Sequence, residues 1–242
     1  MLRRYVAAHP EDQSVLEKYA EAQLGMRPLR PEHIGQAIGA YRKIFNEDPA
    51  DERIFRRLSV LCESVGDLGT LAHIAGQRRE RIPDDPAAAV AQAKDLLYRQ
   101  KPVEAQTALE ELIAKMVAAE KAGPDFVEAC ALAADATQAV GKPGAAEEAV
   151  RHLDQAIERE PANALALIQR AAIRRAMAEA GPQKARQGLL DASRTDLEQA
   201  ERLSSPDPRV RIGLVREWLA HRDFAGAGRC LEAARQLDKG AV

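Results

Sequence analysis

Aromatic residues and cysteines are scarce in this chain of 242 residues: aromatics make up 4% of it, and there are three cysteines. Cys62, Cys130 and Cys230 lie far apart and are odd in number, so they do not make a disulfide framework and they indicate a reducing compartment. We expect all three to be buried as small hydrophobic residues. A disulfide-stabilised secreted domain is therefore excluded.

Long hydrophobic runs are also missing. No stretch reaches the roughly 18 apolar residues that would span a membrane. The first residues, Met-Leu-Arg-Arg-Tyr-Val, lack the apolar core of a signal peptide. Together with the cysteines, these absences predict a cytoplasmic protein.

An excess of charge of one sign is missing too. The chain has 35 Lys and Arg against 37 Asp and Glu, a formal net charge of -2. A surface of mixed sign exerts no net attraction on nucleic acid or on anionic lipid. We therefore expect neither nucleic acid nor a membrane as a partner.

Sequence motifs for catalysis and metal binding are absent. There is no Gly-x-x-x-x-Gly-Lys-Ser/Thr loop for phosphate and no Gly-x-Ser-x-Gly turn for a nucleophilic serine. No two of the five histidines have the i, i+4 spacing of a helical zinc site. Adjacent acidic residues such as Glu147 and Glu148 diverge by about 100° around a helix. The sequence thus predicts no catalytic residue, no metal, no cofactor and no enzymatic activity.

What the chain does have is a repeated pattern that ends in proline. Pro49 and Pro83 stand 34 residues apart. The residues that precede them recur at the same spacing: Ala37, Tyr41 and Ile44 before the first, and Leu71, Ala75 and Arg78 before the second. Ala149, Leu153 and Ala156 precede Pro161 in the same way. A fixed period of this size is typical of repeat proteins.

The pattern resembles the tetratricopeptide repeat, in which small and large apolar residues occupy fixed places on two helices before a closing proline. The resemblance implies an all-α fold, a right-handed α-α superhelix of about six antiparallel helix pairs with a short leading helix near residues 2–8. We expect one domain over residues 1–242, with repeats at 11–48, 49–84, 85–123, 124–161, 162–206 and 207–240.

Capping and helix-breaking residues agree with this reading. They predict helices near 12–24, 32–46, 52–65, 68–81, 86–99, 103–121, 125–140, 145–159, 164–179, 183–203, 208–221 and 224–238. The expected N-caps are Asp12, Asp51, Asp85, Asn163 and Asp207. The glycines expected to end helices in the left-handed conformation are Gly25, Gly66, Gly141 and Gly181.

Both ends of the stack are expected to lack a capping helix. Terminal repeats normally carry a polar outer face that covers the last apolar surface, and neither the residues near 2–8 nor those after Leu237 supply one. This predicts a segment of a longer repeat protein, able to self-associate through its open ends.

The resemblance implies that the first helix of each pair lines a concave groove. Aligned on the prolines, the groove candidates are Arg53, Arg56, Val60, Lys94, Tyr98, Arg175, Arg209 and Arg216. The same alignment places Val90 and Ile168 on this stripe. We expect Arg53, Arg56 and Lys94 to converge beside Tyr98, a patch suited to an acidic or carboxylate-bearing peptide, because guanidinium groups bind carboxylates with two hydrogen bonds.

Three functions remain open at this point. The favoured one is a non-catalytic protein–protein interaction scaffold that binds a peptide or partner domain in the groove. The alternative is a regulatory or assembly segment of a larger enzyme, which docks substrates or self-associates. An RNA-binding helical repeat is disfavoured because the expected basic groove is absent from a chain of net charge -2.

The repeat register predicts the effect of one substitution. Ala149 should lie where the two helices of a pair touch, so Ala149→Leu is expected to overpack that contact and to lower the free energy of unfolding by about 1–3 kcal/mol. Glu147→Leu, on the exposed side of the same helix, should have a much smaller effect. Denaturant unfolding of the two variants checks this; equal losses would mean that the register is wrong in this repeat.

Overall fold

The computed structural model describes residues 9, 12–120 and 123–239, and every regular element among them is an α-helix. The leading helix expected near residues 2–8 lies outside the described residues. The chain divides into two compact units, residues 1–101 (unit 1) and 102–242 (unit 2), and each is described by itself.

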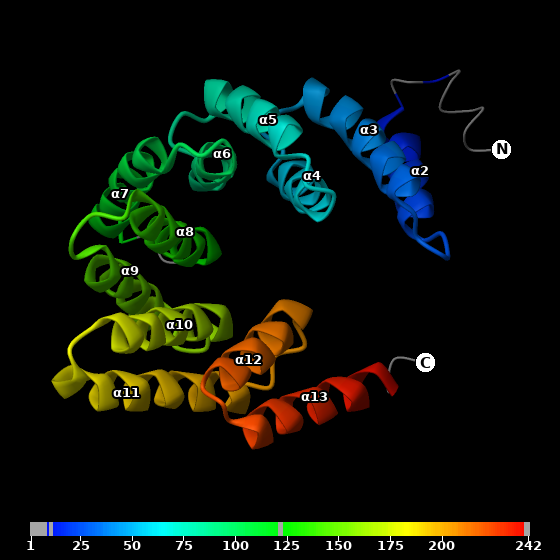
Figure 1. Ribbon diagram of the computed structural model, residues 1–242. Helices are drawn as coiled ribbons and strands as arrows, with labels where there is room; N and C mark the ends of the chain where they lie inside the picture. The colour runs from blue at the N-terminus through cyan, green and yellow to red at the C-terminus, as the bar shows by residue number, and fades with distance from the viewer. Residues whose placement is uncertain (1–8, 10–11, 121–122, 240–242) are drawn as a thin grey trace. The chain divides into compact units, whose positions relative to one another are not determined.

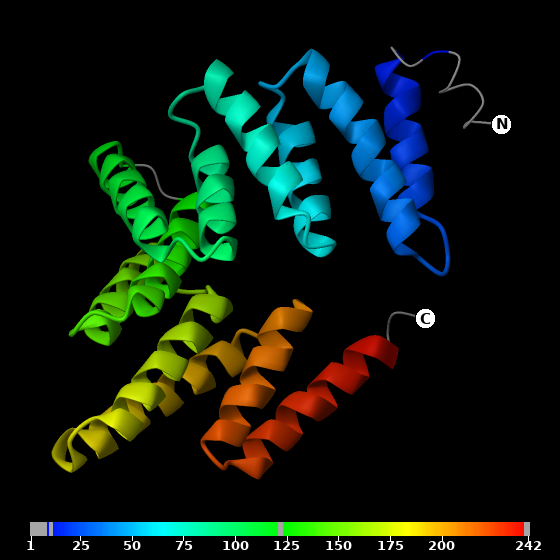
Figure 2. The same cartoon turned by 45° about the horizontal axis from the view of Figure 1, so that its top comes forward.

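The described residues of unit 1 form five helices, which pack in chain order (Figure 1). They are α2 (Gln13–Leu24), α3 (Pro31–Glu47), α4 (Glu52–Ser64), α5 (Leu68–Arg81) and α6 (Pro86–Tyr98). Figure 2 shows them side by side with alternating direction, so the first helices of successive pairs, α2, α4 and α6, run the same way.

In unit 2 the part of the chain that the structure describes forms seven helices. They are α7 (Pro102–Ala118), α8 (Pro124–Val140), α9 (Ala145–Arg159), α10 (Ala164–Ala180), α11 (Gln183–Arg202), α12 (Pro208–Ala220) and α13 (Phe224–Lys239). The pairs are α8 with α9, α10 with α11, and α12 with α13, while α7 packs against α8. The predicted helices are confirmed in both units, and the largest boundary difference is at α7, which ends at Ala118.

The N-caps were predicted correctly because capping depends on local sequence. The side chains of Asp12, Asp51, Asp85, Asn163 and Asp207 each accept a hydrogen bond from a backbone N–H of the first turn. Asp67 caps α5 in the same way and was not predicted.

The glycine predictions are half right. Gly66 and Gly141 have φ of 71° and 68°, the left-handed conformation that glycine adopts without strain. Gly25 and Gly181 do not, since their φ values are -78° and -89°. Gly25 continues the right-handed geometry of its helix, and Gly181 is extended before Pro182, as expected for a residue that precedes proline.

Alanine replaces large side chains at many helix contacts. Ala37, Ala149 and Ala227 are buried, as the repeat register predicts for its small position. The three cysteines are buried as well. Burial raises the pKa of Cys62 and Cys230 to about 11 and that of Cys130 to about 12, so all three stay protonated at neutral pH. The prediction that they serve as small hydrophobic residues is confirmed.

One buried charge joins two repeats of unit 1. Arg78 stands where the preceding repeat has Ile44, yet it is only 3% exposed. Its guanidinium forms an ion pair with Asp85 (Nη2 to Oδ2, 2.8 Å) and donates from Nη1 to the carbonyl of Ala50 (3.0 Å). It also lies 5.0 Å from the centre of the Phe55 ring. Arg78 thus ties the closing turn of one helix pair to the cap of a later helix.

We expect Arg78→Met to destabilise the protein strongly. The change leaves the carboxylate of Asp85 buried without its cation, and breaking a buried pair in this way costs about 3–5 kcal/mol. Arg81→Met, at an exposed position of the same helix, is the matched control and should cost little. Denaturant unfolding compares the two variants; losses of similar size would show that Arg78 does not hold the turns together.

Candidate partner-binding surface on the first helices

The surface that the first helices of unit 1 present is the candidate site. We define the first-helix face of unit 1 by the following residues of α2, α4 and α6: Glu17, Glu21, Arg53, Arg56, Arg57, Val60, Glu63, Lys94 and Tyr98. Five of the predicted site residues belong to it. The remaining three, Arg175, Arg209 and Arg216, lie in unit 2.

Ion pairs connect each first helix of unit 1 to the next. Arg53 of α4 pairs with Glu17 of α2, and Arg57 pairs with Glu21 one turn further on, at 2.9 Å between Nη2 and Oε1. Lys94 of α6 pairs with Glu63 of α4 at 2.6 Å. The three pairs link α2, α4 and α6 along this face.

Glu21 is the most heavily bonded carboxylate of the face. The hydroxyl of the buried residue Tyr41 donates to it, and this hydrogen bond, more than the contact with Arg57, holds the pKa of Glu21 below its usual value. Burial in turn raises the pKa of Tyr41, and the neighbouring carboxylate adds to the effect. The buried Tyr41 of α3 therefore links the ion pairs of this face to the second helix of the same pair.

Two apolar side chains project from this charged face. Val60 is 60% exposed and Tyr98 is 67% exposed. Because α4 and α6 run in the same direction (Figure 2), Val60 lies about one turn before the Glu63–Lys94 pair and Tyr98 about one turn after it. The ion pair thus separates two exposed apolar groups.

The cationic patch expected here is electrically balanced. Arg53 and Lys94 face carboxylates of neighbouring helices, and Arg56 pairs with Glu52 of its own helix at 2.8 Å. The expected excess of positive charge, on which the prediction of an acidic peptide depended, is therefore not present at this patch. Val90, aligned to the same stripe, is buried in the packing of its helix and not part of the surface.

The first helices of unit 2 are linked in a comparable way. Gln169 of α10 donates to Asp135 of α8 at 2.6 Å, and Arg175 of α10 binds Glu217 of α12 at 3.2 Å. Burial raises the pKa of Asp135, and the hydrogen bond from Gln169 opposes this shift. Arg216 also contacts Glu217, and Arg209 pairs with the cap Asp207. Ile168, expected on the surface, is buried.

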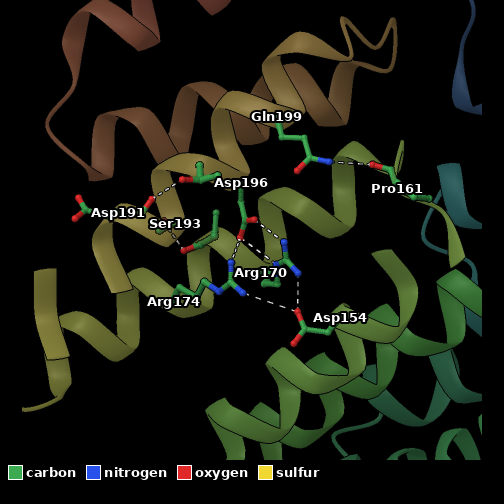
Figure 3. Close-up of polar contacts among 10 residues, drawn as sticks. Asp154, Pro161, Arg170, Arg174, Asp191, Ser193, Asp196 and Gln199 are labelled. Carbon is green, nitrogen blue, oxygen red and sulfur yellow. Dashed lines mark hydrogen bonds and ion pairs between the residues drawn. The ribbon is translucent and has the colours of Figure 1, made fainter. Parts of the chain in front are cut away.

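A partly buried ionic network behind this surface was not predicted (Figure 3). Asp196 of α11 is 2% exposed and binds both Arg170 and Arg174 of α10, with shortest distances of 2.6 and 2.7 Å. Arg170 also reaches Asp154 of α9 at 2.6 Å. The i, i+4 spacing of the two arginines was the available signal. The network joins three consecutive helices, α9, α10 and α11.

Ser193 and His221 are in contact, as a nucleophilic serine and its histidine base would be. In such a pair the serine donates to the histidine, whereas here it donates elsewhere. Ser193 Oγ donates to the carbonyl of Ala171 at 2.8 Å and lies 2.7 Å from His221 Nε2. Because the hydroxyl directs its proton at that carbonyl, it accepts a hydrogen bond from Nε2 of the imidazole. Burial, followed by Arg194 and Arg175, lowers the pKa of His221. The neutral ring therefore acts as a donor that holds α12 to α11.

A third grouping of chemically active side chains lies on second helices. Glu110 of α7 and Glu148 and His152 of α9 place one ligand atom each within 4.8 Å of one another. Burial lowers the pKa of His152, against the opposite effect of the two carboxylates. The sequence signal was Glu148-x-x-x-His152, which a search for pairs of histidines alone does not detect.

Comparison with solved structures defines the class of the fold. A tetratricopeptide repeat protein from Parabacteroides merdae matches with a TM-score of 0.63 at 15% identity, covering 97% of this chain and 83% of that one. TTC0263 of Thermus thermophilus, a thermophilic protein of the same class, gives 0.57 at 20% identity over 74% of this chain and 88% of its own. This chain has the tetratricopeptide-repeat fold that its sequence predicted.

A human IFIT1 dimer with m7Gppp-AAAA also matches, with a TM-score of 0.63 at 14% identity over 93% of this chain. This chain spans half the length of that one. No family model and no curated protein matches the sequence.

The exclusion of nucleic acid from the partners was wrong. Human IFIT1 has the same fold and is solved with m7Gppp-AAAA and with PPP-AAAA. Net charge is an average over the whole surface, so a value near zero does not rule out a local site for RNA. Within the described ranges no helix combines the length and the apolar character needed to cross a bilayer.

Proposed function

We propose that this chain is a non-catalytic scaffold that binds a peptide segment of a partner protein along the first-helix face of unit 1. The supporting observation is the pair of exposed apolar side chains, Val60 and Tyr98, on neighbouring first helices that ion pairs link. Helical-repeat proteins typically use extended surfaces of stacked helices for binding.

The spacing of the two apolar groups suits an extended peptide. Seven residues of helical rise put Val60 and Tyr98 about 10 Å apart along the helix direction, and the sideways separation of α4 and α6 adds to this distance. Side chains i and i+4 of an extended peptide lie on one face and are about 13 Å apart. The two anchors of the peptide would contact Val60 and Tyr98, and its backbone would cross the Glu63–Lys94 pair.

Tyr98 is the residue expected to contribute most to affinity. Its ring offers a large apolar area and its hydroxyl a hydrogen bond, the combination that enriches tyrosine among binding hot spots. The balanced ion pairs around it supply polar contacts to the peptide backbone rather than a net attraction. We therefore infer a partner segment with two apolar anchors and little net charge.

The other candidate functions remain proposals. Docking or assembly within a larger enzyme would use the same surface. RNA binding is suggested by the IFIT1 complexes, which share the fold at 14% identity. RNA binding would differ from peptide binding in its ligand, so the experiment below also measures the binding of an RNA oligonucleotide.

The Val60→Asp/Tyr98→Asp double variant should abolish peptide binding. Peptides are selected from a random phage-displayed library on the full chain, and their affinities are measured by fluorescence polarisation. We expect at least a tenfold loss, because each change places a charge where an apolar anchor docks. Thermal unfolding should change little, since both side chains are exposed.

Lys43→Asp/His73→Asp, at exposed positions on the second helices α3 and α5, is the matched control and should leave affinity unchanged. A folded Val60/Tyr98 variant that binds the selected peptides as tightly as the parent would contradict the proposal. So would the absence of any selectable peptide together with saturable binding of a 5′-triphosphate RNA oligonucleotide.

A further inference from the structure

Glu110, Glu148 and His152 lie on α7 and α9 of unit 2, and none of them belongs to the first-helix face of unit 1. Glu148 and His152 are one turn apart on α9, so they share a helix face, and Glu110 faces them from α7. Their ligand atoms lie within 4.8 Å of one another. Glu110 is exposed, whereas the other two are half-buried.

The imidazole of His152 has a buried nitrogen, Nε2, without a hydrogen-bond partner among the described residues. A buried polar atom without a partner is unusual, because leaving it unpaired costs free energy. Neither carboxylate of the cluster forms a hydrogen bond with the ring in the described part of the chain, although both are close enough to act on its charge.

Glu110 is already oriented by a neighbouring side chain. Gln106, one turn earlier on α7, donates from Nε2 to Glu110 Oε1 at 2.8 Å. Ligating carboxylates are commonly held by such a second hydrogen bond, which fixes their direction and leaves the other oxygen available.

We propose that Glu110, Glu148 and His152 bind one divalent transition-metal ion of the Zn²⁺ class, which links α7 to α9. One imidazole and two carboxylates are a ligand set that zinc accepts, with water at the fourth position. Tetrahedral ligands at about 2.1 Å from the ion lie roughly 3.4 Å apart. The three ligand atoms, within 4.8 Å of one another without an ion, would move closer by about an ångström to reach this spacing.

The ligand chemistry separates Zn²⁺ from the alkaline-earth ions. Mg²⁺ and Ca²⁺ prefer oxygen ligands and six or more of them, whereas an imidazole favours zinc and its neighbours. The cluster contains no cysteine, so its ligand atoms are nitrogen and oxygen. The bound ion is expected to stabilise the folded chain, since a ligand that binds only the native state does so.

The test uses the full chain, stripped of metal with EDTA and then freed of chelator. Isothermal titration with ZnCl₂ should give one saturable site per chain, and Zn²⁺ should raise the temperature of unfolding. CoCl₂ should produce the visible absorption of a low-coordinate site. MgCl₂ and CaCl₂ should bind at least tenfold more weakly than ZnCl₂.

His152→Gln and Glu148→Gln should each weaken Zn²⁺ binding by at least tenfold and remove the thermal shift. Glu147→Gln makes the same charge change one residue away, on an exposed side chain, and should leave the affinity unchanged. The proposal is overturned if the folded parent shows no saturable Zn²⁺ site, if His152→Gln and Glu148→Gln bind as the parent does, or if Mg²⁺ binds as tightly as Zn²⁺.

Discussion

The bond between a closing turn and the second helix of the next pair is the interaction on which the stacking of the helix pairs depends. In unit 1 Arg78 donates to the carbonyls of Pro49 and Ala50 and pairs with Asp85. In unit 2 Gln199 donates to the carbonyl of Pro161 at 3.3 Å (Figure 3). Alanine-rich helix contacts bury little area per residue, so directional polar bonds are needed to set the register of one pair on the next.

The first-helix surfaces follow from that register. Once successive pairs are fixed, residues about one period apart on the first helices come face to face: Glu17 with Arg53, Glu63 with Lys94, and Asp135 with Gln169. Exposed pairs of this kind contribute little to stability, about 0–1 kcal/mol each. In unit 1 their effect is to balance the charge around Val60 and Tyr98, the exposed apolar groups to which the proposed function assigns the binding of a partner.

The sequence predicted the helices and their caps well, because both depend on residues within one turn of each other. It failed where a side chain's partner lies one repeat away. Arg78 was aligned with apolar residues, although its partners are a turn 28 residues earlier and a cap seven residues later. Arg53 was expected in a cationic patch, but Glu17 lies 36 residues before it. A search for opposite charges one period apart would have found this pair. Glu110, Glu148 and His152 meet only because α7 and α9 fold against the same helix.

Site-specific photo-cross-linking tests the binding account most directly. The photoreactive amino acid p-benzoylphenylalanine is placed at Tyr98 in one variant and at His73, on a second helix, in another. Each variant is irradiated with a peptide selected on the parent chain. The account predicts a cross-link from position 98 and none from position 73. A cross-link from position 73, or none from position 98 with a peptide that remains bound, would contradict it.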